Sequence, residues 1–110
     1  MKKASIRSRL SDIVSAVDGA LGTIGNVDFE TFQSTFYMTR TVERCVEIVS
    51  EATKHIPNDL KLRHPEIAWS QIAGIGNVLR HDYDRIDPKI IWEVATKHFP
   101  QVRAVVLVVR

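Results

Sequence analysis

The 110-residue sequence is 45% hydrophobic and 25% charged, which is typical of a soluble globular protein. Its formal net charge of +2 is too small to indicate nucleic-acid binding by itself, although 15 lysines and arginines allow a local basic patch. The single cysteine, Cys45, excludes an internal disulfide and fits a reducing compartment. No apolar run reaches about 18 residues and no signal core follows Met-Lys-Lys, so we expect one cytoplasmic domain over residues 1–110 without a membrane span.

The first half of the sequence predicts two helices. Residues 5–24 carry apolar side chains at helical spacing, and this helix is expected to be capped near Ser5 and to end at Gly25. Asp28 is expected to cap a second, long helix that continues to about residue 56 and ends before Pro57, because the residue before a proline avoids helical geometry. The expected core positions of the second helix are Phe32, Phe36, Val42, Val46, Val49 and Ala52.

The second half predicts further helices. Residues 60–64 are expected to form a polar link to a third helix, with Pro65 in its first turn. Asp87 and Pro88 are expected to begin a fourth helix, which Pro100 interrupts. The valine-rich tail, residues 101–110, fits either a helix or a strand, and we predict a helix because no second strand exists to pair with it. These elements predict an all-α, antiparallel bundle of four to five helices.

The third helix carries a compact group of polar side chains near its C-terminal end. Winding the stretch at about 100° per residue places them on one side, opposite the apolar stripe, with Tyr83 at the border. Histidine transfers protons near neutral pH, arginine holds phosphate by bidentate contacts, and a tyrosine hydroxyl can bond a phosphate. Together they predict a site that binds and cleaves a phosphodiester. The polar residues of that side are Asn77, Arg80, His81 and Asp84.

A structural explanation of the same residues stays open. The end of the helix is then a solvated surface, held by local ion pairs such as Arg80 with Asp84. Other sites are disfavoured: the four histidines are scattered without ligand spacing, so we predict no metal. The sequence lacks a complete Gly-rich phosphate loop, so we predict no cofactor.

Several segments in fixed order resemble one protein family. The sequence around Arg44 and Glu51, the segment from Pro65 to Trp69, and Gly-Asn-Val-Leu-Arg-His-Asp-Tyr at residues 76–83 are similar to those of HepT toxins in the HEPN ribonuclease superfamily. The likeness covers about residues 5–105. The family's mark is an arginine followed, after four to six residues, by histidine, any residue and tyrosine.

The resemblance implies a function and a set of roles. Members of this family are helical bundles that form homodimers and act as metal-independent endoribonucleases, as the toxins of type VII toxin–antitoxin systems. Their antitoxin partner is a minimal nucleotidyltransferase of the MntA type, which in some systems adenylylates the motif tyrosine. Carried over, His81 is the motif histidine and Tyr83 is both the motif tyrosine and the modification target. Arg80 supplies the catalytic cation, and Asn77 and Arg85 are candidate substrate-binding residues on RNA.

One position departs from the family pattern. Gly76 stands where the family has its arginine, just before the asparagine. Arg80 lies about 40° further round the helix and one turn on, so its long side chain can substitute for that arginine. Three hypotheses follow: an RNA-cleaving toxin, a catalytically degenerate homodimer that binds a nucleotidyltransferase, or a structural bundle without RNA contact. If replacing Gly76 by arginine raises cleavage, the missing arginine limits the activity.

Overall fold

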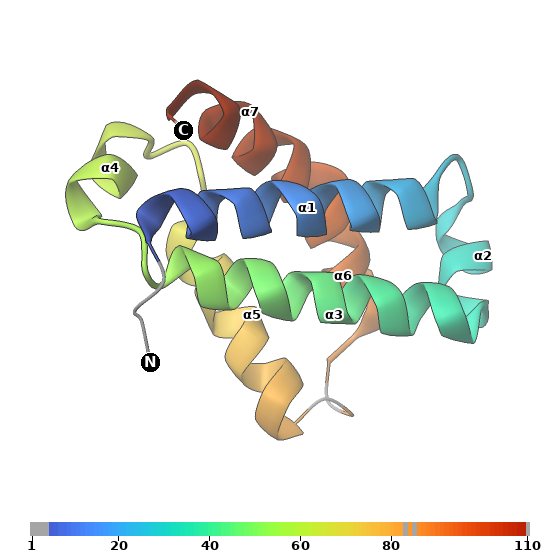
Figure 1. Cartoon of the computed structure of the whole chain (residues 1–110). Helices are drawn as coiled ribbons and strands as arrows, with labels where there is room; N and C mark the ends of the chain where they lie inside the picture. Colours follow the sequence, from blue (N-terminus) through green and yellow to red (C-terminus); the bar gives the residue numbers. More distant parts are fainter. Residues whose placement is uncertain (1–4, 83, 85, 110) are drawn as a thin grey trace.

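The computed structural model describes residues 5–82, 84 and 86–109, and all regular structure in this part of the chain is helical. None of its helices is both long and apolar enough to cross a membrane. The elements, shown in Figure 1, are α1 (Ile6–Ile24), α2 (Phe29–Ser34), α3 (Phe36–Thr53), α4 (Asn58–Arg63), α5 (Trp69–Asp82), α6 (Pro88–Glu93), the π-helical turn η2 (Val94–His98) and α7 (Phe99–Val109).

The predicted ends of α1 are confirmed. The Ser5 side chain accepts a hydrogen bond from the backbone N–H of Ser8 at 3.1 Å, which satisfies one of the free donors of the first turn. At the other end Gly25 has a φ of 54°, and its N–H donates to the Leu21 carbonyl. Only glycine adopts this left-handed conformation without strain, so the helix ends there.

The predicted second helix is two helices, which corrects the expectation of one helix from Asp28 to about residue 56. Asp28 does cap α2, but Thr35 takes an extended conformation (φ −107°, ψ 104°) between α2 and α3. Its hydroxyl donates to the Thr31 carbonyl at 2.6 Å, which gives this segment an alternative to helical bonding. Phe36, predicted to be in the core, follows the break and is 76% exposed.

Two boundaries around α4 also differ from prediction. The segment predicted as a polar link contains α4, which buries Leu60. Pro65 lies in the turn before α5, whose first residue is Trp69, and not in the first turn of that helix. The Trp69 indole N–H donates to the His64 carbonyl at 3.0 Å, which ties the end of α4 to the start of α5.

The C-terminal segment is helical from Pro88 to Val109, so the predicted helical tail is confirmed but the predicted interruption at Pro100 is wrong. In a regular α-helix, the ring of Pro100 would clash with the carbonyl four residues earlier. Here the preceding turn is π-helical, with the N–H of Phe99 bonded to the carbonyl of Val94. This wider turn changes the local geometry just before the proline, and the chain continues as α7.

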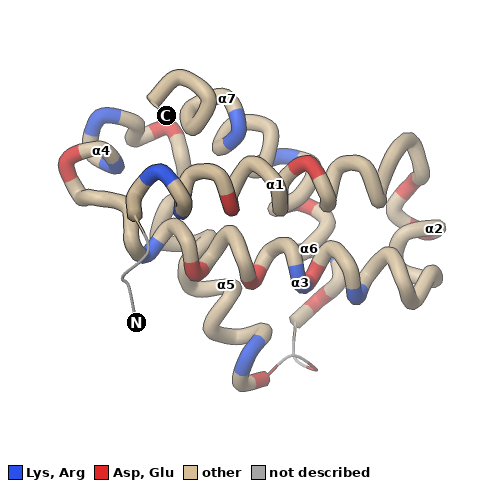
Figure 2. The backbone as a smooth tube through the Cα atoms, in the orientation of Figure 1, with Lys and Arg blue, Asp and Glu red and all other residues tan. Residues whose placement is uncertain are grey.

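The helices form the predicted all-α bundle. Figure 1 shows α1 and α3 side by side and antiparallel, with α5 crossing α3 and α7 lying along α1. The core lies between these four helices, and α2 and α6 contribute to it. Its largest fully buried side chains include Phe32, Phe99, Ile13, Ile72 and Ile91. The C-terminal end of α5 projects away from the α1–α3 pair and carries charged residues, as Figure 2 shows.

Candidate functional site

The candidate site depends on how closely α5 approaches α3. Ser50 of α3 is completely buried, and its hydroxyl donates to the Ala73 carbonyl of α5 at 2.9 Å. Gly76 is the point of closest approach, because a Cβ at this position would lie 2.0 Å from Ser50 Oγ and 2.3 Å from Ser50 Cβ. Glycine is therefore required for this packing of the two helices.

This packing makes Gly76→Arg an unsuitable test of whether a missing arginine limits cleavage. Position 76 is buried and faces α3, so any side chain there would meet Ser50 before it reached the polar cluster. A real Cβ atom does not approach another heavy atom to 2.0 Å, and Gly76→Arg would force the two helices apart. The cation of this site must come from other positions.

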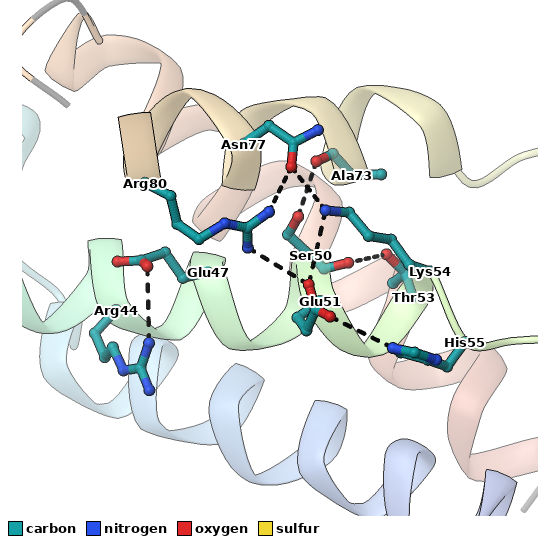
Figure 3. Close-up of polar contacts among 10 residues, drawn as sticks. All are labelled: Arg44, Glu47, Ser50, Glu51, Thr53, Lys54, His55, Ala73, Asn77 and Arg80. Atoms are coloured by element: carbon teal, nitrogen blue, oxygen red, sulfur yellow. Dashed lines mark hydrogen bonds and ion pairs between the residues drawn. The ribbon is translucent and has the colours of Figure 1, made fainter. Parts of the chain in front are cut away.

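Two such cations, Arg80 and Lys54, converge on Asn77 (Figure 3). Lys54, the residue after α3, donates from Nζ to the side-chain oxygen of Asn77 at 2.7 Å. The guanidinium of Arg80 donates to the same oxygen. Glu51 lies beneath both, with its Oε2 atom 3.5 Å from Arg80 and 3.7 Å from Lys54. We call these four residues the α3–α5 cluster.

The charge of the cluster favours an anion. Its single carboxylate, Glu51, has a lowered pKa, first because of the contact with His55 Nε2 at 3.4 Å and further because of Lys54 and Arg80. Glu51 is therefore ionised at neutral pH and balances one of the two cations, which leaves a net positive charge. The side chains of Arg80 and Lys54 are 33% and 30% exposed, so both can contact a ligand from solvent.

The predicted residues of the third helix are only partly brought together. Asn77 and Arg80 lie on one side of α5, as predicted, but Arg80 pairs with Glu51 of α3, and no Arg80–Asp84 ion pair occurs among the described residues. His81, next to Arg80 near the end of α5, is exposed, and its ring makes no hydrogen bond or ion pair within the described part of the chain. Tyr83 and Arg85 lie outside the described residues.

The sequence did not predict Lys54 or the role of Glu51. Glu51 is on α3 and Lys54 follows its last residue, whereas the predicted cluster is on α5, and their place in the site follows from the close α3–α5 approach at Gly76. A partial signal was present: Glu51 and Lys54 are three residues apart and so share a helix face. The sequence around Glu51 also belongs to the segments that resemble HepT.

A pocket opens beside the α3–α5 cluster, between α1 and α3. It has a volume of about 460 Å³ and includes Glu51 and Arg80 of the cluster. Within the described residues, no group of three or more His, Cys, Asp or Glu side chains is arranged to hold a metal ion. The other residues that line the pocket are Arg9, Asp12, Arg44, Glu47, Ile48 and Ala52.

The arrangement suits phosphate chemistry. Two half-exposed cations fixed by a shared acceptor can hold the oxygens of a phosphodiester, and preorganised charge stabilises the extra negative charge of a pentavalent transition state. The exposed imidazole of His81 follows Arg80 directly in the helix.

Comparison with known proteins identifies the family. The sequence model of the HepT-like family, described as ribonuclease HepT-like, matches residues 9–109. A Methanocaldococcus jannaschii protein named "Putative RNase MJ0125" is 32% identical over 103 residues, which cover 94% of this chain and 89% of that protein. A Thermococcus cleftensis protein named "Probable ribonuclease HepT" is 33% identical over 101 residues and covers 92% of each chain. No solved structure matches. The chain therefore belongs to the ribonuclease HepT-like family.

Proposed function

We propose that this chain is a metal-independent endoribonuclease that cleaves RNA at the C-terminal end of α5. The observation that supports this most is the convergence of Arg80 and Lys54 on Asn77, with the exposed His81 following Arg80 in the sequence of α5. The two cations hold the scissile phosphodiester, and His81 transfers protons. Membership of the family and the names of the relatives agree with this reaction.

The proposed reaction uses the nucleophile that RNA itself carries. His81 removes the proton of a ribose 2′-OH, and the oxygen forms a bond to the adjacent phosphorus. The P–O5′ bond then breaks, and the departing 5′ oxygen takes a proton from the imidazolium or from water. Arg80 and Lys54 stabilise the negative charge that develops on the phosphoryl oxygens. The products are a 2′,3′-cyclic phosphate and a 5′-hydroxyl.

The biological setting in this proposal comes from the resemblance to HepT toxins. Two chains form a homodimer whose motifs face a shared cleft, with Tyr83 as the motif tyrosine and Arg85 as a candidate RNA-binding residue. A cognate minimal nucleotidyltransferase neutralises the toxin and adenylylates Tyr83. The second candidate is a degenerate homodimer that binds this partner without cutting RNA, and the glycine at position 76 is the observation that favours it.

Cleavage of total RNA in excess chelator tests the proposal. The wild-type chain is expected to produce fragments with cyclic-phosphate ends, and His81→Ala is expected to lower the rate by 100-fold or more, since a positioned acid–base group contributes about 10²–10⁴-fold. His64→Ala is the matched control, because His64 follows α4 and its ring pairs with Glu66 at 3.4 Å.

Three outcomes separate the candidates. Cleavage by the wild type and by His64→Ala, but not by His81→Ala, supports the enzyme. Equal cleavage by the wild type and both variants would show that His81 has no catalytic role. Absence of cleavage by the wild type favours the partner-binding module, and co-purification of the chain with a nucleotidyltransferase is then the deciding measurement.

A further inference from the structure

The pocket between α1 and α3 continues beyond the α3–α5 cluster as a groove. Its first part, of about 460 Å³, contains three arginines: Arg9 from α1, Arg44 from α3 and Arg80 from α5. A second hollow of about 300 Å³ adjoins it, shares Asp12 and Ile48 with it, and is mainly apolar. Volumes of this size are in the range of small-molecule and cofactor sites, about 300–1,000 Å³. We call the two parts together the α1–α3 groove.

Two arginines of the groove, Arg9 and Arg44, are poorly satisfied by the described residues. Arg9 Nε is buried and has no hydrogen-bond partner among them. Arg44 lies 3.7 Å from Glu47, and charge-assisted hydrogen bonds are normally about 2.7–2.9 Å long, so this contact does not use the full bonding capacity of its guanidinium. Arg80 differs, because it donates to Asn77 in addition to its 3.5 Å contact with Glu51. An incoming anion can therefore gain hydrogen bonds that no carboxylate of the groove supplies.

The three carboxylates of the groove limit what this anion can be. Asp12, Glu47 and Glu51 balance the formal charge of the three arginines, so the groove does not attract anions by net charge. They are not arranged as a metal-ligand set within the described residues. A singly charged phosphodiester fits this balance better than a doubly charged phosphate, because it brings less negative charge close to the carboxylates.

One part of the groove is charged and the other is mainly apolar, which matches the phosphate and the base of a nucleotide. The arginine-lined part lies next to Arg80, where the proposed reaction takes place. The adjoining part is lined by Ala16, Cys45 and Ile48 together with the polar Asp12 and Ser15, and its surface is mainly apolar, which suits the face of a base. A strand whose reacting phosphate lies at Arg80 can thus place its neighbouring phosphate near Arg44 and Arg9.

We infer that the α1–α3 groove is an RNA-binding subsite for the nucleotide next to the cleaved phosphodiester. Arg9 and Arg44 contact its phosphate, and the apolar part of the groove contacts its base. The inference rests on the proposed function, because it takes the reacting phosphate to be at Arg80. It assigns a role to two arginines that lie outside the histidine–tyrosine motif.

The test measures RNA binding separately from cleavage. A fluorescently labelled single-stranded RNA is titrated with the full-length His81→Ala variant, and its anisotropy is followed at several salt concentrations. Adding Arg9→Gln and Arg44→Gln together is expected to weaken binding about tenfold, since both charge-assisted contacts to the phosphate are replaced by weaker neutral ones. The slope of log affinity against log salt is expected to fall by about 0.7, which corresponds to one phosphate contact.

The matched control is the pair Arg7→Gln and Arg40→Gln in the same His81→Ala background. These arginines lie on the same two helices but do not line the groove, and Arg40 pairs with Glu43 at 3.2 Å. The control removes the same charge, and we expect less than a threefold loss of affinity. Thermal melting of both double variants checks that they remain folded. A parallel titration replaces the RNA by AMP.

Each outcome bears on the inference. A selective loss of affinity and salt slope in the groove variant supports it. Equal losses in both double variants would mean that only overall charge matters, and no RNA binding by the parent overturns it as well. AMP binding that depends on Arg9 and Arg44, without RNA binding, would show a mononucleotide site instead. Cleavage by the wild-type chain is scored independently, so the subsite can fail while the proposed enzyme stands, or the reverse.

Discussion

Two glycines of α5 have opposite surroundings. A Cβ at Gly74 would meet nothing within 4 Å, whereas a Cβ at Gly76 would lie 2.0 Å from Ser50 Oγ. Neither glycine has a positive φ, so the difference is one of space and not of backbone strain. Gly76 therefore serves helix packing, and Gly74 only lowers the intrinsic stability of the helix.

Alanine substitutions measure this difference. Gly74→Ala is expected to raise the free energy of unfolding by up to about 1 kcal/mol, because glycine is a poor helix former. Gly76→Ala is expected to lower it by about 1–3 kcal/mol, the usual cost of overpacking a core. Urea unfolding of both variants checks the opposite signs.

A second substitution tests whether Ser50 causes the loss of stability in Gly76→Ala. A Ser50→Gly background removes the two atoms nearest to the new methyl group at position 76, Ser50 Oγ and Cβ, and leaves the Cα atom of residue 50 at 3.8 Å. The cost of Gly76→Ala is then expected to shrink. A cost that stays the same in this background would show that Ser50 is not the obstacle.

The pKa of Glu51 predicts a dependence of stability on pH. Its contacts with His55, Lys54 and Arg80 lower the pKa of the folded state below the ordinary value of 4.5. Such a group stabilises the folded state above its unfolded pKa, and this contribution is lost as the pH falls through the folded pKa. The melting temperature of the wild type is expected to exceed that of Glu51→Gln at about pH 7, and this difference is expected to vanish near about pH 3.

The same comparison with Glu47→Gln is the control. Glu47 is one turn before Glu51 in α3, and within the described part of the chain its ion pair is with Arg44 of its own helix, at 3.7 Å. A melting difference for Glu51→Gln that persists unchanged at acid pH would mean that its ion pairs contribute nothing to stability and that the variant acts through packing.

At the scale of single elements, α5 is the part of the fold that most determines the site. It packs mainly against α3, and its C-terminal end extends beyond the α1–α3 pair (Figure 1). The helical period was enough to predict that Asn77 and Arg80 share a side of α5, because this depends only on residue spacing. It could not predict that Lys54 and Glu51 join them, since this requires the distance and angle between two helices.

Two helix boundaries show a second limit of prediction. The break at Thr35 interrupts a continuous helical pattern, and it depends on a hydroxyl that forms a local bond to the Thr31 carbonyl. Pro100 gives the opposite error, because a π-helical turn absorbs a residue that would otherwise break the helix. In both places local geometry overrides the periodicity and the residue preferences from which helices are predicted.

At the scale of the whole molecule, the order of helices and most of the core follow from the sequence. The apolar stripes of α1 and α3 are buried where predicted, with exceptions at the helix starts such as Phe36 and Ile6. Stripes of this kind bury themselves in any bundle, so they are predictable without knowledge of the packing. The close approach at Gly76 is specific to this bundle, and so is the α1–α3 groove.

The molecular mass in solution tests the proposed homodimer. Light scattering at micromolar concentration is expected to give twice the 12.5 kDa of one chain. Cleavage by a cleft shared between two chains is then expected to fall more steeply than linearly when the protein is diluted below the dimer dissociation constant. A monomer that cuts RNA with a rate proportional to its concentration would contradict the shared cleft.

The contact between Ser50 and Gly76 also constrains how the sequence of this protein can change over time. Arginine at position 76 and serine at position 50 exclude each other in this packing. A single substitution that brings the two together would therefore not be tolerated. A lineage that acquires the arginine must first shorten residue 50, and it then loses the hydroxyl that bonds the Ala73 carbonyl. We therefore expect positions 50 and 76 to covary among relatives. Relatives with Ser50 are expected to have Gly76 and to use cations at the positions of Arg80 and Lys54.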